Sequence, residues 1–119
     1  HIARAVLESI ALQNHVLLEL MEKTSETKLS QLRVDGGAAA NNLLMQFQAD
    51  ILQKTIVRPQ VLETTAMGAA TMAALGAGML SSLHDLKGRR EGDQVFIPSM
   101  EVEKVTQYTK MYKKMVFKA

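Results

Sequence analysis

The chain has 119 residues, enough for one domain, and its 47% hydrophobic and 22% charged residues are typical of a folded globular protein rather than a disordered one. Its net charge of +2 is too small for a continuous nucleic-acid-binding face, and its 4% aromatic residues offer few platforms for base stacking. The absence of cysteine excludes disulfides and thiolate metal sites and suits a reducing compartment such as the cytoplasm.

The first element expected along the chain is a helix over residues 2–22, predicted from apolar residues at helical spacing. Its predicted core stripe consists of Ile2, Val6, Ile10, Leu17 and Met21. The pattern starts without a capping residue, so we expect the chain to be a piece of a longer protein. The polar residues 23–30 predict a surface loop after this helix.

The segment that follows is the most informative part of the sequence. A short strand predicted over residues 32–34 leads through Asp35, Gly36 and Gly37 into a helix predicted over residues 41–52. Glycines lack a Cβ, so a ligand can approach the backbone N–H groups beside the start of a helix, which is the kind of place where a nucleotide binds. The spacing matches neither GxxxxGK[ST] nor GxGxxG, the two common phosphate-loop motifs.

The spacing alone leaves two interpretations of this turn open. In the first, Gly36 and Gly37 lie against a nucleotide, and the side-chain amide of Asn41 contacts the base or ribose. In the second, which the spacing favours, the turn only connects strand and helix, and Asn41 caps the helix. Asp35 is likewise predicted to accept hydrogen bonds within the turn rather than to act as a general base, because no partner for a base is evident.

Next along the chain, a strand is predicted over residues 56–58, ended by Pro59. A third helix follows, with Thr64 or Thr65 as the predicted N-cap. This helix is built almost entirely from alanine and glycine, so we expect its backbone to lie close to another element. Its apolar run is far shorter than the roughly 20 residues of a membrane-spanning helix.

The rest of the sequence predicts a polar connection over residues 81–98, with turns at Gly88 and Gly92, a brief strand over residues 95–97 and a last helix over residues 101–118. The predicted inner face of that helix is Val105, Tyr108, Tyr112 and Met115. The alternation of helices and short strands predicts an α/β fold. The three histidines show no metal-ligand spacing.

Four segments resemble glycerol kinases, which belong to the carbohydrate kinases with an actin- and Hsp70-like ATPase core. They are HIARAVLESIA over residues 1–11, LRVDGGA over 32–38, NNLLMQFQADIL over 41–52, and RP followed by ETTAMGAA over 58–70. The segments occur in the same order as in that family, and the resemblance as a whole extends over nearly the whole chain.

The resemblance implies a ribonuclease H-like (actin-like ATPase) fold, with residues 1–119 forming the C-terminal part of the second, nucleotide-binding domain. It implies transfer of the γ-phosphoryl group of ATP to glycerol with magnesium, and a homo-oligomeric full-length enzyme. Gly37 and Asn41 fall on family positions that contact the adenosine of ATP, and Gly36 adjoins them. The resemblance places the glycerol-binding and catalytic residues in upstream segments, so we expect this chain alone to be inactive.

Two alternatives are open beside this resemblance. One is another carbohydrate kinase, for xylulose or gluconate, although the pattern of residues 45–50 favours glycerol kinase. The other is a non-catalytic nucleotide-binding or interaction module, because two places depart from the family pattern. Residues 14–16 are Asn-His-Val where Thr-Arg-Asp is usual, and Tyr112 replaces a tryptophan.

Overall fold

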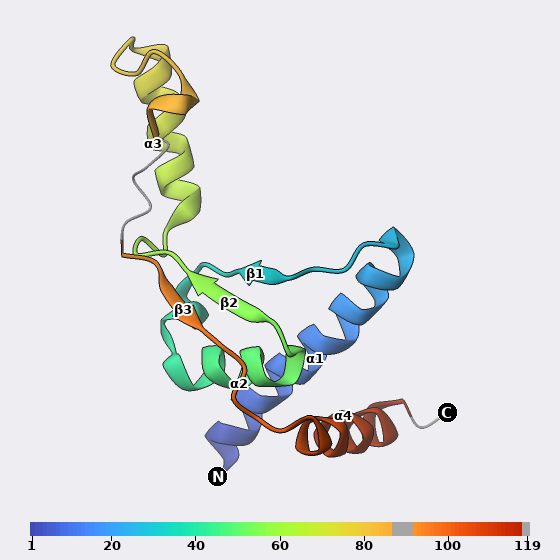
Figure 1. Cartoon of the computed structure of the whole chain (residues 1–119). Helices are drawn as coiled ribbons and strands as arrows, with labels where there is room; N and C mark the ends of the chain where they lie inside the picture. Colours follow the sequence, from blue (N-terminus) through green and yellow to red (C-terminus); the bar gives the residue numbers. More distant parts are fainter. Residues whose placement is uncertain (87–91, 118–119) are drawn as a thin grey trace.

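The computed structural model describes residues 1–86 and 92–117, which form an α/β arrangement of helices around a small sheet (Figure 1). The helices are α1 (Ile2–Ser25), α2 (Asn42–Leu52), α3 (Thr64–Gly76) and α4 (Val102–Val116), the strands are β1 (Gln31–Arg33), β2 (Thr55–Arg58) and β3 (Gln94–Phe96), and the 3₁₀ turns are η1 (Gly37–Ala40) and η2 (Leu83–Leu86). The predicted α/β class is confirmed, and each predicted helix and strand is present within a few residues of its expected bounds.

The sheet is mixed, with the strand order β1-β2-β3. β1 runs parallel to β2, and β3 runs antiparallel to β2 at the other edge. The register places Leu32, Ile56 and Phe96 in one row across the three strands, and all three side chains belong to or pack against the buried core. This row is the face of the sheet that the helices cover.

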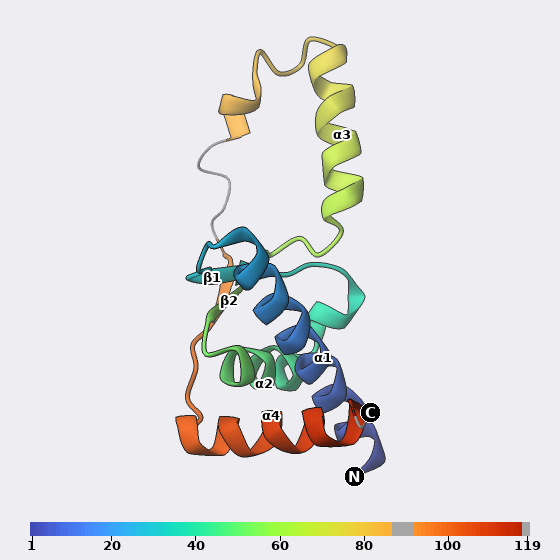
Figure 2. The same cartoon turned by 90° about the vertical axis from the view of Figure 1, so that its right-hand side faces the viewer.

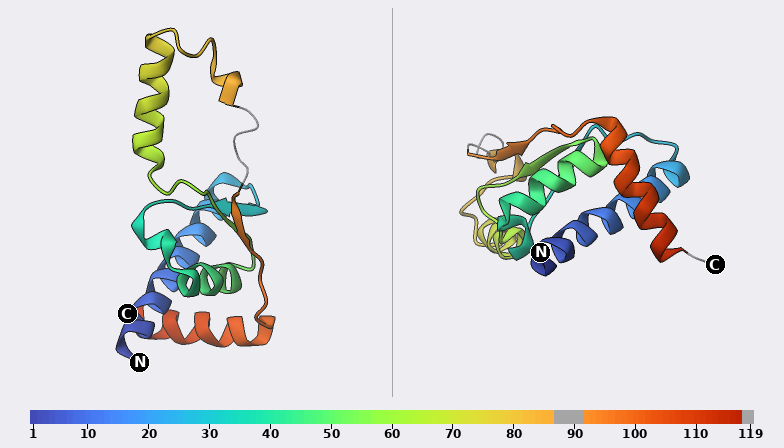
Figure 3. Two further views of the ribbon diagram at one scale, coloured as in Figure 1. Left: turned by 90° about the vertical axis from the view of Figure 1, so that its left-hand side faces the viewer. Right: turned by 90° about the horizontal axis from the view of Figure 1, so that it is seen from below.

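Helix α2 lies at the centre of the core, between the sheet and α4, with α1 alongside (Figures 2 and 3). Its residues at helical spacing, Leu44, Phe47, Gln48 and Ile51, are all buried. Phe47 meets Tyr108 of α4 edge to face, with 5.4 Å between the ring centroids. From Leu44 onward α2 is therefore enclosed on most sides.

Two buried polar side chains of α2 connect it to its neighbours. The Oε1 atom of Gln48 accepts a hydrogen bond from Nδ2 of Asn14 on α1, at 3.2 Å. The Oδ1 atom of Asp50 accepts from the backbone N–H groups of Ser99 at 2.7 Å and Met100 at 3.2 Å. These bonds satisfy groups that would be costly to bury alone, and they fix the chain between β3 and α4.

The predicted core stripe of the first helix is largely wrong. Of its five residues only Ile10 packs against the core, whereas Ile2 is 84% exposed and Val6, Leu17 and Met21 are more than half exposed. The buried positions are instead Ala11, Leu12 and Leu18. Apolar residues occur on more than one side of this helix, so periodicity alone does not tell which side packs. α1 also continues to Ser25, through the start of the expected loop, before Glu26 ends it with a φ of 53°.

Helix α3 projects away from the other elements, as Figure 1 shows, and none of its residues is buried. A Cβ added at Gly68 or Gly76 would have no atom within 4 Å among the described residues. The expected close approach of another element to this helix is therefore not found within residues 1–86 and 92–117. The predicted N-cap is also wrong, because Glu63 takes that position and Thr64 is the first helical residue.

The last helix has nearly the inner face that the sequence predicts. Val105 is buried and Tyr108 and Tyr112 pack against the core, but Met115 is 70% exposed. Gly92 adopts a φ of 95°, as a turn glycine does, and the turn expected at Gly88 lies outside the described residues. In the part of the chain that the structure describes, no helix has the length and apolar character to cross a membrane.

Candidate functional site

The glycine turn connects the end of β1 to the start of α2. Pairing with β2 continues one residue past β1, because the N–H of Val34 donates to the carbonyl of Val57 at 3.0 Å. The chain then turns at Gly36, whose φ of 81° and ψ of 172° fall in a region that is essentially restricted to glycine. The 3₁₀ turn η1 follows at once, so the first glycine is required by the backbone conformation itself.

Gly37 has a different environment. It is exposed, and a Cβ built on it would meet no atom within 4 Å. Two residues further on, Ala39 is only 2% exposed and anchors the underside of η1 in the core. The turn is thus held from below while its Gly37 edge is open to an approaching molecule.

Asn41 is the N-cap of α2. Its Oδ1 atom accepts a hydrogen bond from the backbone N–H of Leu44 at 3.0 Å, and its own carbonyl accepts from Met45 at 3.0 Å. The capping interpretation of Asn41 is therefore confirmed. The cap uses only the oxygen of the side-chain amide, and among the described residues no acceptor takes a hydrogen bond from Nδ2, so this donor is available to a ligand.

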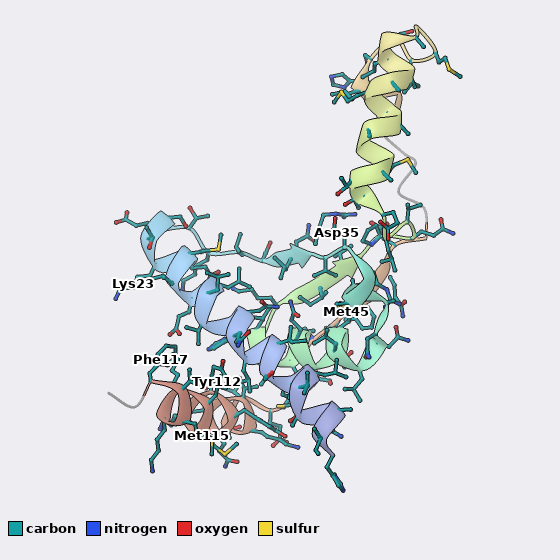
Figure 4. All side chains as sticks on the ribbon, turned by 180° about the vertical axis from the view of Figure 1, so that it is seen from behind. Lys23, Asp35, Met45, Tyr112, Met115 and Phe117 are labelled. Carbon is teal, nitrogen blue, oxygen red and sulfur yellow. The ribbon has the colours of Figure 1, made fainter. Side chains whose placement is uncertain are left out.

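Asp35 binds the start of α3 to the turn. Its Oδ2 atom accepts a hydrogen bond from the hydroxyl of Thr64, and the N–H of Gly36 donates to the carbonyl of Leu62 at 3.0 Å. In Figure 4 the labelled Asp35 lies beside the base of α3. Asp35 thus accepts a hydrogen bond, as predicted, but from a residue distant in sequence, and Thr64 bonds to Asp35 instead of capping its own helix.

A depression of about 200 Å³ lies next to the turn, where the parallel strands β1 and β2 end. It is lined by Arg33, Val34, Asp35, Pro59 and Thr64. Ligands of α/β proteins commonly bind outside the carboxyl ends of parallel strands. Gly36 directly follows the lining residue Asp35, but Gly36, Gly37 and Asn41 do not themselves line this depression. Within the described residues, no cluster of three or more His, Asp or Glu side chains could hold a metal ion.

Sequence reasoning missed the role of Arg58, the last residue of β2. Its Nη1 atom donates to the carbonyl of Ala39 at 2.6 Å, and its Nη2 atom donates to Oδ1 of Asn42 at 2.8 Å. The guanidinium therefore reaches into η1 and the first residue of α2. A charged residue ending an otherwise apolar strand, directly before Pro59, was the only sequence signal for such a role.

In a comparison with known protein families, most of the chain matches one family. Residues 1–77 match the C-terminal domain of the FGGY family of carbohydrate kinases. The chain belongs to this family. The matched region includes the glycine turn, β2 and all of α3, so the candidate site lies within the FGGY domain.

Among individual relatives, the chain is similar to glycerol kinases. The chain is 54% identical over 104 residues to glycerol kinase 1 of Saccharolobus solfataricus, covering 87% of this chain and 21% of that protein. It is 48% identical over all 119 residues to the glycerol kinase of Deinococcus radiodurans, covering 24% of that protein. The chain thus spans between a fifth and a quarter of the length of these relatives.

Solved structures confirm the predicted fold. The crystal structure of Plasmodium falciparum glycerol kinase with ADP superposes with a TM-score of 0.82 at 34% identity, covering 98% of this chain and 24% of that one. Gluconate kinase from Lactobacillus acidophilus superposes with a TM-score of 0.69 at 22% identity, over 93% of this chain and 22% of that one. The neighbours have the actin-like ATPase fold, and this FGGY segment forms part of such a fold, as predicted.

Proposed function

We propose that this chain forms the adenosine-binding part of a glycerol kinase, an enzyme that transfers the γ-phosphoryl group of ATP to glycerol. The observation that carries the proposal is the gradient of identity among FGGY relatives. Glycerol kinases are 48% to 55% identical to this chain, and one of 34% identity was crystallised with ADP. The gluconate and xylulose kinases are only 22% and 18% identical to this chain. They share its fold, but this identity does not support gluconate or xylulose as the substrate.

The geometry of the turn supports a nucleotide at this position. Gly37 offers backbone that a flat ring or ribose can approach closely, and Asn41 offers the Nδ2 donor that its capping bond leaves over. Gly36 shapes the turn through its φ of 81°. We therefore assign Gly37 and Asn41 to direct contact with the adenosine of ATP or ADP, and Gly36 to the conformation that presents them.

The proposed role of this segment is positioning rather than chemistry. Phosphoryl transfer needs little covalent help from a protein and depends mainly on alignment and charge stabilisation. The described residues offer no cluster of side chains for magnesium, so we assign no metal ligand here. Glycerol, the metal and the catalytic groups belong in this proposal to the other parts of a full-length enzyme, whose oligomeric state and cytoplasmic location stay predictions.

The alternative of a non-catalytic module was suggested partly by residues 14–16, which depart from the usual family sequence. The structure of this segment does not support that alternative. Asn14, which replaces the usual threonine, donates to Gln48 and so holds α1 against α2. This contact explains the residue as part of the packing between helices. Such a packing contact requires no loss of the nucleotide site.

Steady-state kinetics of the intact enzyme test the proposal. Gly37→Ala should raise the KM for ATP and Gly37→Val should raise it further, because a growing side chain enters the space where the nucleotide approaches. The KM for glycerol and the melting temperature should change little, since no described atom lies within 4 Å of the added Cβ. Ala3→Val, which enlarges an exposed side chain on α1, is the matched control. An unchanged KM for ATP in Gly37→Val would overturn the assignment.

A further inference from the structure

Arg58 connects three elements that the sequence separates. Besides its bonds to the carbonyl of Ala39 and to Oδ1 of Asn42, its Nη2 atom donates to Oε1 of Gln94 on β3. Its guanidinium also lies over the ring of Phe96, 5.2 Å from the centroid. The side chain is therefore held on its face and at its edge, as a planar guanidinium can be and a flexible ammonium cannot.

The two residues of the turn to which Arg58 donates hydrogen bonds, Ala39 and Asn42, lie beside the proposed adenosine contacts in the sequence. Ala39 lies in η1 between Gly37 and Asn41, and Asn42 directly follows Asn41. A shift of the Ala39 carbonyl would move the backbone on both sides of it, because η1 is only four residues long. The orientation of the exposed Gly37 edge and of the Asn41 amide thus depends on where the guanidinium holds Ala39 and Asn42.

The charge of Arg58 is not neutralised nearby. Its hydrogen-bond acceptors are a backbone carbonyl and two side-chain amides, and within the described residues it forms no ion pair. Hydrogen bonds from a charged donor are roughly twice as strong as neutral ones. Arg58 therefore holds the turn with strong bonds that no carboxylate competes for.

We propose that Arg58 is a positioning residue of the nucleotide site, which fixes η1 and the start of α2 so that Gly37 and Asn41 face the adenosine correctly. The inference rests on the proposed function and adds a residue that does not itself touch the nucleotide. It concerns the shape of the guanidinium rather than its charge. A lysine at position 58 keeps the charge but cannot bond to Ala39 and Asn42 in the same fixed fork.

The test uses the intact enzyme with Arg58→Lys and Asn42→Ala, alone and together. Arg58→Lys should raise the KM for ATP roughly tenfold, the size expected when hydrogen bonds from a charged donor are lost. The KM for glycerol and kcat at saturating ATP should stay within about twofold, because the chemical step uses groups elsewhere. Asn42→Ala should raise the KM for ATP by a smaller factor. The double variant should raise it by less than the product of the two single factors, because both substitutions remove the same hydrogen bond between Arg58 and Asn42.

Two controls make the result decisive. Arg4→Lys makes the same exchange on α1, where the exposed arginine pairs with Glu8 one turn away, and should leave every parameter unchanged. A folded Arg58→Lys enzyme with a wild-type KM for ATP would overturn the inference, and if that variant does not fold, a wild-type KM in Asn42→Ala would do so. Gly37→Val separates the two proposals. If it raises the KM for ATP while Arg58→Lys does not, only the role of Arg58 fails, and if neither does, the nucleotide site itself is wrong.

Discussion

Replacing Asn41 separates the capping of α2 from the proposed contact with ATP, because the two roles use different atoms of one amide. Oδ1 accepts from Leu44 at 3.0 Å, and loss of such a cap costs about 0.5–2 kcal/mol of folding free energy. The Nδ2 contact with adenosine, as a neutral hydrogen bond, should contribute about 0.5–1.5 kcal/mol to nucleotide binding. Asn41→Ala removes both groups. Asn41→Ser keeps an oxygen that can cap the helix but removes the donor.

The assay is the free energy of unfolding of each variant together with its KM for ATP and for glycerol. Asn41→Ala should lose about 1 kcal/mol of stability, whereas Asn41→Ser should stay within a few tenths of the wild type. Both should raise the KM for ATP by a factor of roughly 2 to 13, which is the binding loss expressed as a ratio. If Asn41→Ser binds ATP as the wild type does, while Asn41→Ala only melts earlier, then Asn41 is a cap and nothing more.

Further expectations concern stability and activity. Gly36→Ala should lower the free energy of unfolding by about 1–3 kcal/mol, because its φ of 81° disfavours a Cβ, and an unchanged denaturation midpoint would contradict this. Burial lowers the pKa of His15, and a hydrogen bond from a lysine lowers the pKa of Glu19. The folded state thus binds fewer protons, so stability should fall as the pH drops below about 6.5 for His15 and below about 4.5 for Glu19. Urea titrations of His15→Gln should show a flatter fall below pH 6.5 than the wild type, and equal slopes would contradict the assignment. Ala70→Leu and Ala73→Leu should hardly affect this chain alone, where both sites are exposed, but should cost about 1–3 kcal/mol in a full-length enzyme in which α3 packs against other segments. This chain alone should produce no ADP from ATP and glycerol above a buffer control.

The order and approximate bounds of the elements could be predicted because local signals agree with the tertiary structure. In α2 the apolar positions Leu44, Phe47 and Ile51 lie at helical spacing and are all buried. The capping role of Asn41 followed from residue type and place. The turn at Gly36 was expected as well, although its φ and ψ were not.

Contacts between residues that are distant in the sequence could not be predicted in the same way. α1 has apolar residues on more than one side, and the buried set around Ala11 depends on how α2 crosses it. Thr64 has the residue type of an N-cap, but a carboxylate 29 residues earlier, Asp35, accepts its hydroxyl instead. The role of Arg58 depends on three elements meeting at the end of β2, which periodicity within one element does not reveal.

The central claim is that ATP binds with its adenosine against the glycine turn, and a crystal structure of the intact enzyme with a non-hydrolysable ATP analogue tests it most directly. We expect the adenosine to pack on the backbone at Gly37 and to accept a hydrogen bond from Nδ2 of Asn41, while Oδ1 still caps α2. An analogue bound at full occupancy with its adenosine away from both residues would contradict the claim.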